Sequence, residues 1–343
     1  MDALVARSGA ERVVGMTHSV RCEDEQRAFE RWRRRGVHLI ECDLLTLPKE
    51  NITPPLFDVV YHLAAQARPE STSADFRVNS DGTRNLLQWL APVLEGKRLI
   101  FSSTLACVDA PRSGLEITEN TACRPRTPYG RTKLEAENVI RELHQRLKFD
   151  YTILRLCTTV GVGCRATGMF GVLPRMLIRH AMATRLNWPG RVSLIGVEDV
   201  VRILMSLPNF PKTRNELFVM SNGENPSFDL VLAEMASILG CSRDPLRLPP
   251  WLWRMAGAFC WRMSVMGVLP HAAHTFFWRL SHMIYDGVCA DGSKLDAVLH
   301  PSYRPYKECL AAIYNKNQTG DARAATATAL TSHPGESSSE AAP

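Results

Sequence analysis

The stretch KRLIFSS, residues 97–103, decides the fold. It is an apolar run of strand length between two amphipathic patterns, TRNLLQWLAPVLE at 83–95 and KLEAENVIRELHQRL at 133–147, which predict helices. Strands that are apolar on both faces and separated by helices are typical of a parallel sheet covered on two sides. The alternation recurs with strand-like runs at RVVGM (12–16), VHLIECD (37–43), FDVVYHLA (57–64) and YTILRL (151–156). The sequence therefore predicts a doubly wound α/β fold.

The alternating pattern ends near residue 165, and we expect a smaller C-terminal lobe over residues 166–314. Strand-like segments near 191–222, including RVSLIGVEDVV at 191–201, are expected to join the core in part. Large apolar residues become scarce from Asn315 onward, which predicts a disordered tail over 315–343.

Composition narrows the class of protein. The 343 residues are 45% hydrophobic and 22% charged, so the chain can bury a large core. The net charge of +6 is spread along the chain and gives little support for nucleic acid binding. The ten cysteines form no Cys-x-x-Cys spacing, which indicates reduced thiols in a cytoplasmic protein, with no disulfide framework and no metal site.

The most apolar region is rich in tryptophan and phenylalanine and covers residues 249–280. Arginine, proline and histidine interrupt it, so we predict no transmembrane segment. The region can line an apolar pocket, rest on a membrane surface, or form a pair of amphipathic core helices.

The stretch PYGRTKLEAENVI, residues 128–140, carries the clearest chemical signal. On a helix, Tyr129 and Lys133 lie one turn apart on the same face. A nearby ammonium favours the phenolate, so such a pair can exchange a proton with an alcohol or ketone near neutral pH. A second pair with this spacing, Tyr303 and Lys307, has Pro305 between its members, and we interpret it as chance.

In order and spacing, the motifs resemble the extended short-chain dehydrogenase/reductase family, which includes NAD-dependent epimerases and dehydratases. The resemblance runs from about residue 12 to 314. It rests on FDVVYHLAAQARP, FRVNSDGTRNLL, FSST and PYGRTK, followed by VSLIGVEDVV, ELFVMSNGENPSFDLVLAEMASILG and ADGSKLDAVLHPSYRPYKECLAAI.

The resemblance implies a Rossmann-type sheet that binds a dinucleotide through residues 1–165, and a substrate-binding lobe over 166–314. It implies that Thr104 orients the substrate oxygen and that Tyr129 is the acid/base. Lys133 would lower the tyrosine pKa and bind the nicotinamide ribose.

Further residues match the family's cofactor rim: Asp43, His62, Ala64, Ala65, Asn79 and Ser102, beside Tyr129 and Lys133. Simpler readings exist, since Asp43 could cap a turn, Asn79 could cap a helix, and the small residues could be a packing site. The cofactor would be NAD or NADP. Thr17, His18 and Arg21 stand where NAD-selective members place an acid, which favours NADP.

One family feature is missing. A first strand followed by Gly-x-x-Gly-x-x-Gly does not occur, and MDALVARSGAER at 1–12 resembles only the end of the first helix. Two neighbouring strands should then lack a partner between them. We expect either that the chain begins late or that it is a degenerate protein that binds dinucleotide poorly.

The resemblance implies an NAD(P)-dependent epimerase or oxidoreductase that acts on a secondary alcohol or ketone, most simply of a nucleotide sugar, and that forms a homodimer. The aromatic region at 249–280 leaves a second reading, a reductase of apolar alcohols similar to 3β-hydroxysteroid dehydrogenases. A third is a non-catalytic binding protein.

Overall fold

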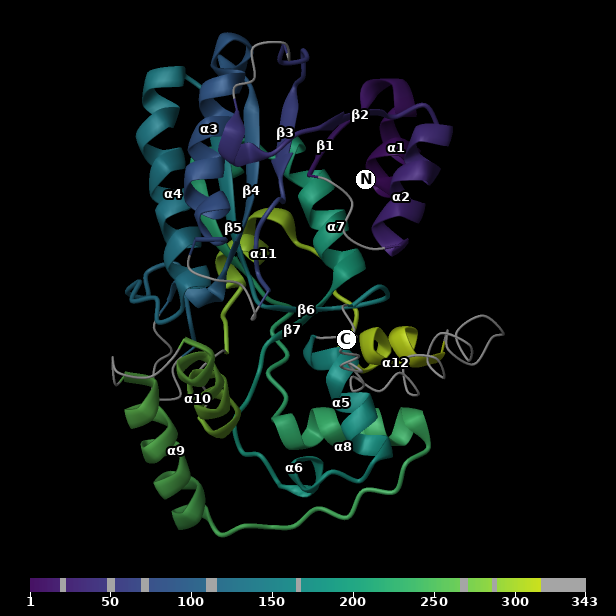
Figure 1. The fold of residues 1–343 in the computed structure, drawn as a ribbon, viewed down its shortest axis with the longest axis vertical. Coiled ribbons are helices and arrows are strands. Elements are labelled where there is room, and N and C mark those ends of the chain that lie inside the picture. Colours follow the sequence, from purple (N-terminus) through teal and green to yellow (C-terminus); the bar gives the residue numbers. More distant parts are fainter. Residues whose placement is uncertain are drawn as a thin grey trace, which may run out of the picture.

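The computed structural model describes residues 1–18, 23–47, 53–68, 74–108, 116–164, 168–265, 271–285 and 289–315 (Figure 1). Arg21 and residues 316–343 therefore lie outside the described residues.

The centre of the molecule is a parallel sheet. Its neighbouring strands, in order, are β3 (Val59–His62), β4 (Arg98–Thr104), β5 (Asp150–Leu156) and β8 (Glu216–Met220). The register pairs His62 with Phe101 and Thr104 with Leu156, so the carboxyl ends of the strands meet at one edge. A ligand of a doubly wound sheet binds at that edge.

Helices cover both faces of this sheet (Figure 1). Leu99 and Phe101 of β4 pack with α3 (Arg77–Leu94) and α4 (Pro128–Leu147), whereas Ile100 packs on the opposite face. That opposite face is covered by α7 (Val197–Ser206) and α11 (Ser293–Leu299). This alternation is the two-residue period of a strand that is buried on both sides. The doubly wound α/β prediction is confirmed.

The first two strands form a separate parallel pair, β1 (Val14–Thr17) with β2 (His38–Glu41). Within the described residues no ladder joins β1 to β3, so each of them has a partner on one side only. Helices α1 (Asp2–Ser8) and α2 (Glu23–Arg34) pack beside this pair, with Asp2 accepting a hydrogen bond from Trp32. The sheet is therefore interrupted at the place where the sequence predicts a missing neighbour.

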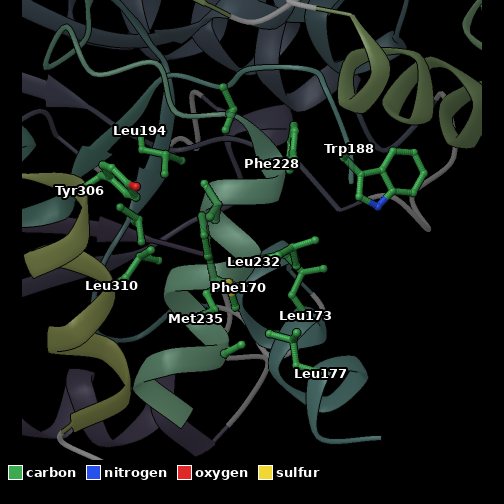
Figure 2. Close-up of a cluster of buried hydrophobic side chains, with 14 of the residues drawn as sticks. Phe170, Leu173, Leu177, Trp188, Leu194, Phe228, Leu232, Met235, Tyr306 and Leu310 are labelled. Atoms are coloured by element: carbon green, nitrogen blue, oxygen red, sulfur yellow. The ribbon is translucent and has the colours of Figure 1, made fainter. Parts of the chain in front are cut away.

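Apart from the packing on the two faces of the central sheet, a separate cluster of apolar side chains forms the core of the C-terminal lobe (Figure 2). It lies among α5 (Met169–Ile178), α8 (Phe228–Leu239) and α12 (Tyr306–Asn315), next to the short α6 (Met182–Arg185) and the strand pair β6 (Thr158–Val160) and β7 (Leu194–Gly196). The prediction of a strand over residues 191–201 is largely wrong. Only three of its residues are strand, because helix α7 begins at Val197 and makes VEDVV its first turns.

The aromatic region forms two helices, α9 (Pro250–Val265) and α10 (His271–Ile284), which pack against each other at the edge of the lobe (Figure 1). Among the described residues, no helix is both long and apolar enough to cross a bilayer. Short 3-10 helices complete the fold: η1 (Ala10–Arg12), η2 (Leu44–Thr46), η3 (Leu105–Cys107), η4 (Leu207–Asn209) and η5 (Pro211–Thr213).

Candidate active site

Helix α4 begins at the motif that holds the tyrosine and lysine. Thr127 is its N-cap and accepts a hydrogen bond from the Gly130 amide at 3.1 Å, while Pro128 occupies the first helical position. Tyr129 and Lys133 therefore lie within one continuous helix, one turn apart on the same face.

Lys133 is buried in an unusual way. Its side chain is 1% exposed, and its Nζ has no hydrogen-bond partner among the described residues. The nitrogen lies 3.9 Å from the centre of the Phe101 ring, which stabilises a cation only in part. Burial lowers the pKa of Lys133 to about 8, against smaller opposing effects from Cys107 and Glu137. An ammonium group only donates hydrogen bonds, and a ligand hydroxyl can supply the acceptor that this buried ammonium lacks among the described residues.

Tyr129 and Thr104 come from adjoining elements. Tyr129 is half-buried, with its ring 6.4 Å from that of Phe76. Thr104 is the last residue of β4 and is also half-buried, and its Oγ1 accepts a hydrogen bond from the Ala106 amide at 3.2 Å. Helix α4 starts close to this turn, because a Cβ added to Gly130 would lie 2.0 Å from the Ala106 carbonyl oxygen.

Gly130 is a residue that the sequence analysis missed. Only a glycine permits this approach of backbone to backbone, and the approach is what sets the Thr104 turn against the Tyr129 helix. The available signal was a glycine inside a predicted helix, beside the tyrosine.

Asn79 links two segments next to the lysine. Its amide accepts a hydrogen bond from the Gln66 amide at 2.7 Å and donates to the Gln66 carbonyl and to Thr132 on α4, both at 3.0 Å. The N-cap of α3 is Phe76, so Asn79 lies in the first turn and the alternative reading of it as a helix cap is wrong. Its position fixes the loop after β3 against the active helix.

The loop after β3 forms a rim at the carboxyl edge of the sheet. Ala64 and Ala65 are exposed there, so the alternative of a small-residue packing site is wrong for these two. His62 is buried and its Nε2 lies 2.8 Å from Thr83 Oγ1. Burial, and then the charge of Lys133, lower the pKa of His62 to about 3, so the imidazole is neutral at pH 7. Ser102 donates to the His62 carbonyl at 3.5 Å.

Asp43 follows strand β2. Its carboxylate caps η2 by accepting a hydrogen bond from the Leu45 amide at 2.9 Å, so it does cap a turn, as the simpler reading expects. Its other oxygen lies 3.8 Å from His18 Nε2. Thr17 ends strand β1 and donates to the His18 carbonyl at 2.9 Å. These three residues lie together at the ends of the separate strand pair.

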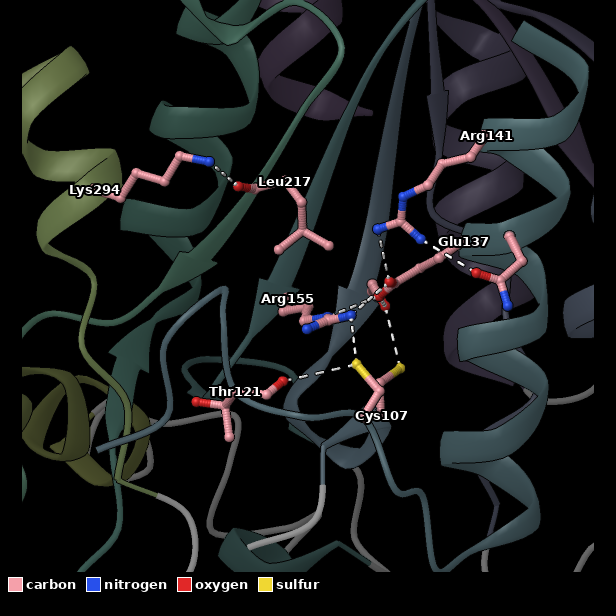
Figure 3. Close-up of polar contacts among 10 residues, drawn as sticks. Cys107, Thr121, Glu137, Arg141, Arg155, Leu217 and Lys294 are labelled. Carbon is pink, nitrogen blue, oxygen red and sulfur yellow. Dashed lines mark hydrogen bonds and ion pairs between the residues drawn. The ribbon is translucent and has the colours of Figure 1, made fainter. Parts of the chain in front are cut away.

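Figure 3 shows a charged cluster around Glu137 and Arg155 that the sequence analysis also missed. Glu137, one turn after Lys133 on α4, accepts hydrogen bonds from Arg155 Nε at 3.0 Å and Nη2 at 2.8 Å, and from Ser103 at 2.6 Å. Burial raises the pKa of Glu137, but the hydrogen bonds and charge of Arg155 more than offset this and lower it. The available signal was an acid four residues after Lys133, on the same face of the predicted helix.

The residues fit a nicotinamide dinucleotide in part. Lys133 Nζ has no hydrogen-bond acceptor in the part of the chain that the structure describes, and it suits the ribose of the cofactor. The exposed Ala64 and Ala65 and the strand ends suit its backbone. The interruption between β1 and β3 lies where the phosphate-binding strand of such a sheet would stand.

Comparison with known proteins decides the family. The family model described as "NAD dependent epimerase/dehydratase family" matches residues 3–216 of this chain. The chain belongs to this family. The predicted family is therefore confirmed, and with it the prediction that the protein is of an enzyme class that uses a nicotinamide cofactor.

Relatives in the epimerase/dehydratase family are similar over different shares of the chain. UDP-glucose 4-epimerase from Vibrio cholerae is 24% identical over 258 residues, 70% of this chain and 76% of that protein. UDP-glucose 4-epimerase 2 from Oryza sativa subsp. japonica is 33% identical over 155 residues, 43% of this chain and 37% of that protein. The second alignment thus spans well under half of the rice protein.

Solved structures of low identity share the fold. One is UDP-glucuronic acid 4-epimerase from Bacillus cereus in complex with UDP-glucuronic acid and NAD. It has a TM-score of 0.69, is 19% identical, and the match covers 92% of this chain and 94% of that one. Another is RMD from Pseudomonas aeruginosa complexed with NADPH, with a TM-score of 0.63 and 18% identity, covering 90% and 100%.

Proposed function

We propose that this family member is an NAD(P)-dependent epimerase or oxidoreductase that acts on a secondary alcohol or ketone of a nucleotide sugar. The sugar assignment is supported by its relatives, which are named as UDP-sugar 4-epimerases. The catalytic assignment rests on one observation, a buried ammonium that lacks a hydrogen-bond acceptor among the described residues and lies one helical turn from a half-buried tyrosine.

In this proposal Tyr129 exchanges a proton with the reacting hydroxyl of the sugar. The positive charge of Lys133 favours the phenolate and so brings the tyrosine pKa toward neutral pH. The Thr104 hydroxyl, held by its bond to the Ala106 amide, orients the substrate oxygen. A bound nicotinamide would supply the hydride exchange.

The chain's own residues would hold the cofactor at several points. Lys133 would bind the nicotinamide ribose through its Nζ, and the Ala64 and Ala65 backbone would approach the dinucleotide. Asn79 would keep the loop after β3 in place, as its bonds to Gln66 indicate. Ser102, His62 and Asp43 complete the proposed set.

We further propose that NADP is the preferred cofactor. Thr17 and His18 lie at the end of β1, where an acid would select the ribose hydroxyls of NAD. Calorimetric titration of the protein with NADP and with NAD, in parallel, tests this preference. We expect tighter binding of NADP, and tighter binding of NAD would overturn the proposal.

The sharpest test of the catalytic assignment is Tyr129→Phe. Because it removes only the proton-exchanging hydroxyl, kcat with a UDP-sugar substrate should fall by about 10² to 10⁴-fold while substrate binding and folding are retained. Tyr303→Phe is the matched control, since Tyr303 also precedes a lysine by four residues but donates its hydroxyl to Asp296. That control should keep its turnover.

Near-normal turnover in Tyr129→Phe would remove Tyr129 as the acid/base. If the unmodified protein binds UDP-sugars and cofactor without turning any of them over, the non-catalytic reading is supported instead. Turnover of apolar alcohols but of no UDP-sugar would favour the steroid-dehydrogenase-like reading.

The organisation of the chain completes the proposal. We assign dinucleotide binding to residues 1–165 and substrate binding to residues 166–314, and we expect two copies to pair through the helices near Tyr129. Light scattering coupled to gel filtration tests the homodimer, because a monomeric mass would contradict it. We assign the protein to the cytoplasm because the cysteines that the structure describes are free thiols.

A further inference from the structure

The inner face of helix α9 is firmly packed. Trp253, Gly257 and Cys260 are buried at helical spacing, and the Trp253 ring lies 4.9 Å from that of Trp188. A Cβ added to Gly257 would lie 2.5 Å from the ring of Tyr285, the residue that follows α10. The position of α9 on the lobe is therefore fixed by one face, and its other face is turned outward.

The outer face of α9 is apolar as well. Trp251, Met255 and Phe259, four residues apart, are 57%, 63% and 57% exposed, and Phe276 of α10 adds a further exposed ring. A surface helix normally places polar side chains opposite its buried stripe. Large apolar side chains gathered on one exposed helix face mark an interaction surface.

The charge of the hairpin indicates the chemistry of its partner. From Pro250 to Ile284 the sequence contains three arginines and three histidines but no aspartate or glutamate. Arg254 and Arg262 are exposed on α9. Arg262 is seven residues from Met255, so Arg262 and Met255 lie on the same side of the helix. Exposed aromatic and aliphatic side chains beside arginines, without acids, suit an interface between anionic headgroups and acyl chains.

We propose that the α9–α10 hairpin docks on the surface of an anionic phospholipid bilayer. Trp251, Met255 and Phe259 enter the boundary between headgroups and acyl chains, and Arg254 and Arg262 bind lipid phosphates. The hairpin lies along the surface without spanning it.

Docking would place the active site at the membrane interface. The Arg126 guanidinium lies 5.1 Å from the centre of the Trp261 ring on α9, and the next residue, Thr127, caps the helix that holds Tyr129. The hairpin also lies toward the carboxyl ends of the central strands (Figure 1). Helix α9 and helix α4 are thus connected through the short segment at Arg126 and Thr127.

Vesicle co-sedimentation tests the proposal with the full chain and no substrate, so its outcome is independent of the proposed activity. The probes are vesicles of phosphatidylcholine alone and of phosphatidylcholine mixed with phosphatidylglycerol. We expect binding to the mixed vesicles, weakened about tenfold or more by Trp251→Ser/Met255→Ser/Phe259→Ser and by Arg254→Glu/Arg262→Glu. Leu230→Ser, which removes an exposed apolar side chain on α8, is the control and should bind like wild type.

Circular dichroism and thermal unfolding of each variant establish that it folds. The proposal is overturned if folded wild type binds neither vesicle, or if the triple variant binds as wild type does. It is also overturned if gel filtration shows an oligomer that the triple variant abolishes, because the face is then a protein interface.

Discussion

Two buried cations, Lys133 within helix α4 and Arg155 on the neighbouring strand β5, have very different surroundings. Arg155, 3% exposed, donates two hydrogen bonds to the Glu137 carboxylate. Lys133, one helical turn before Glu137, has an aromatic ring on one side and no hydrogen-bond acceptor among the described residues. The pKa values reflect this, since the pairing with Glu137 outweighs burial and raises that of Arg155, whereas burial lowers that of Lys133.

The difference separates a structural charge from a functional one. The Arg155 charge is compensated within the fold, so it can join β5 to α4 in a fixed geometry. The Lys133 charge costs stability in the protein alone and can be compensated by a ligand. A fold retains such a group where binding or chemistry requires it, which supports the proposed site.

The largest expected effect comes from breaking the compensated pair. Glu137→Gln keeps the shape of the side chain but leaves Arg155 charged and buried, so the free energy of unfolding should fall by about 3 to 5 kcal/mol. Urea unfolding followed by circular dichroism measures it. Glu142→Gln on the same helix is the matched control. It removes an exposed bridge to Arg84, which solvent screens, so the free energy of unfolding should change far less than in Glu137→Gln.

A double variant sharpens this comparison. Replacing both partners, as Glu137→Leu/Arg155→Met, removes the two charges of this pair together, so it should be much less destabilising than the sum of the two single variants. If the losses simply add, the pair is not energetically coupled and the contrast with Lys133 is lost.

Much of the fold could be predicted because its signals are local. The apolar run in β4 and the amphipathic pattern of α4 lie within short windows of sequence, and the Tyr129 to Lys133 spacing is fixed by one helical turn. The interruption between β1 and β3 was also predictable, because the known order of strands says which neighbours a missing strand would have joined.

Other features depend on contacts between distant segments. Glu137 and Arg155 come from different elements. The sequence shows Glu137 as one of several charges on an amphipathic helix and Arg155 as a single charge in an apolar strand, so nothing in it pairs the two. The VEDVV segment contains three β-branched residues that suit a strand, yet the acids Glu198 and Asp199 lie in the first turn of a helix there. Tertiary packing decides such cases.

Removing the Lys133 charge should change the free energy of unfolding by less than breaking the Glu137–Arg155 pair, and in the opposite direction. Lys133→Met replaces an uncompensated ammonium with an apolar side chain that suits the Phe101 ring. Without cofactor it should therefore raise the free energy of unfolding at about pH 7 by about 1 to 3 kcal/mol, while reducing turnover. Lys212→Met, which removes an exposed lysine, is the control.

The pH dependence of the stability difference between Lys133→Met and wild type tests whether the Lys133 charge is the cause of this gain in stability. The pKa of Lys133 is about 8 in the folded protein against an ordinary 10.5, so between these values the unfolded chain binds more protons than the native one. Wild-type stability should then rise with pH relative to Lys133→Met, and the advantage of the variant should shrink between about pH 7 and about pH 9.5. Unfolding curves at both pH values measure the difference. An advantage that grows with pH would mean that the Lys133 charge stabilises the native state, and that the group is compensated as Arg155 is.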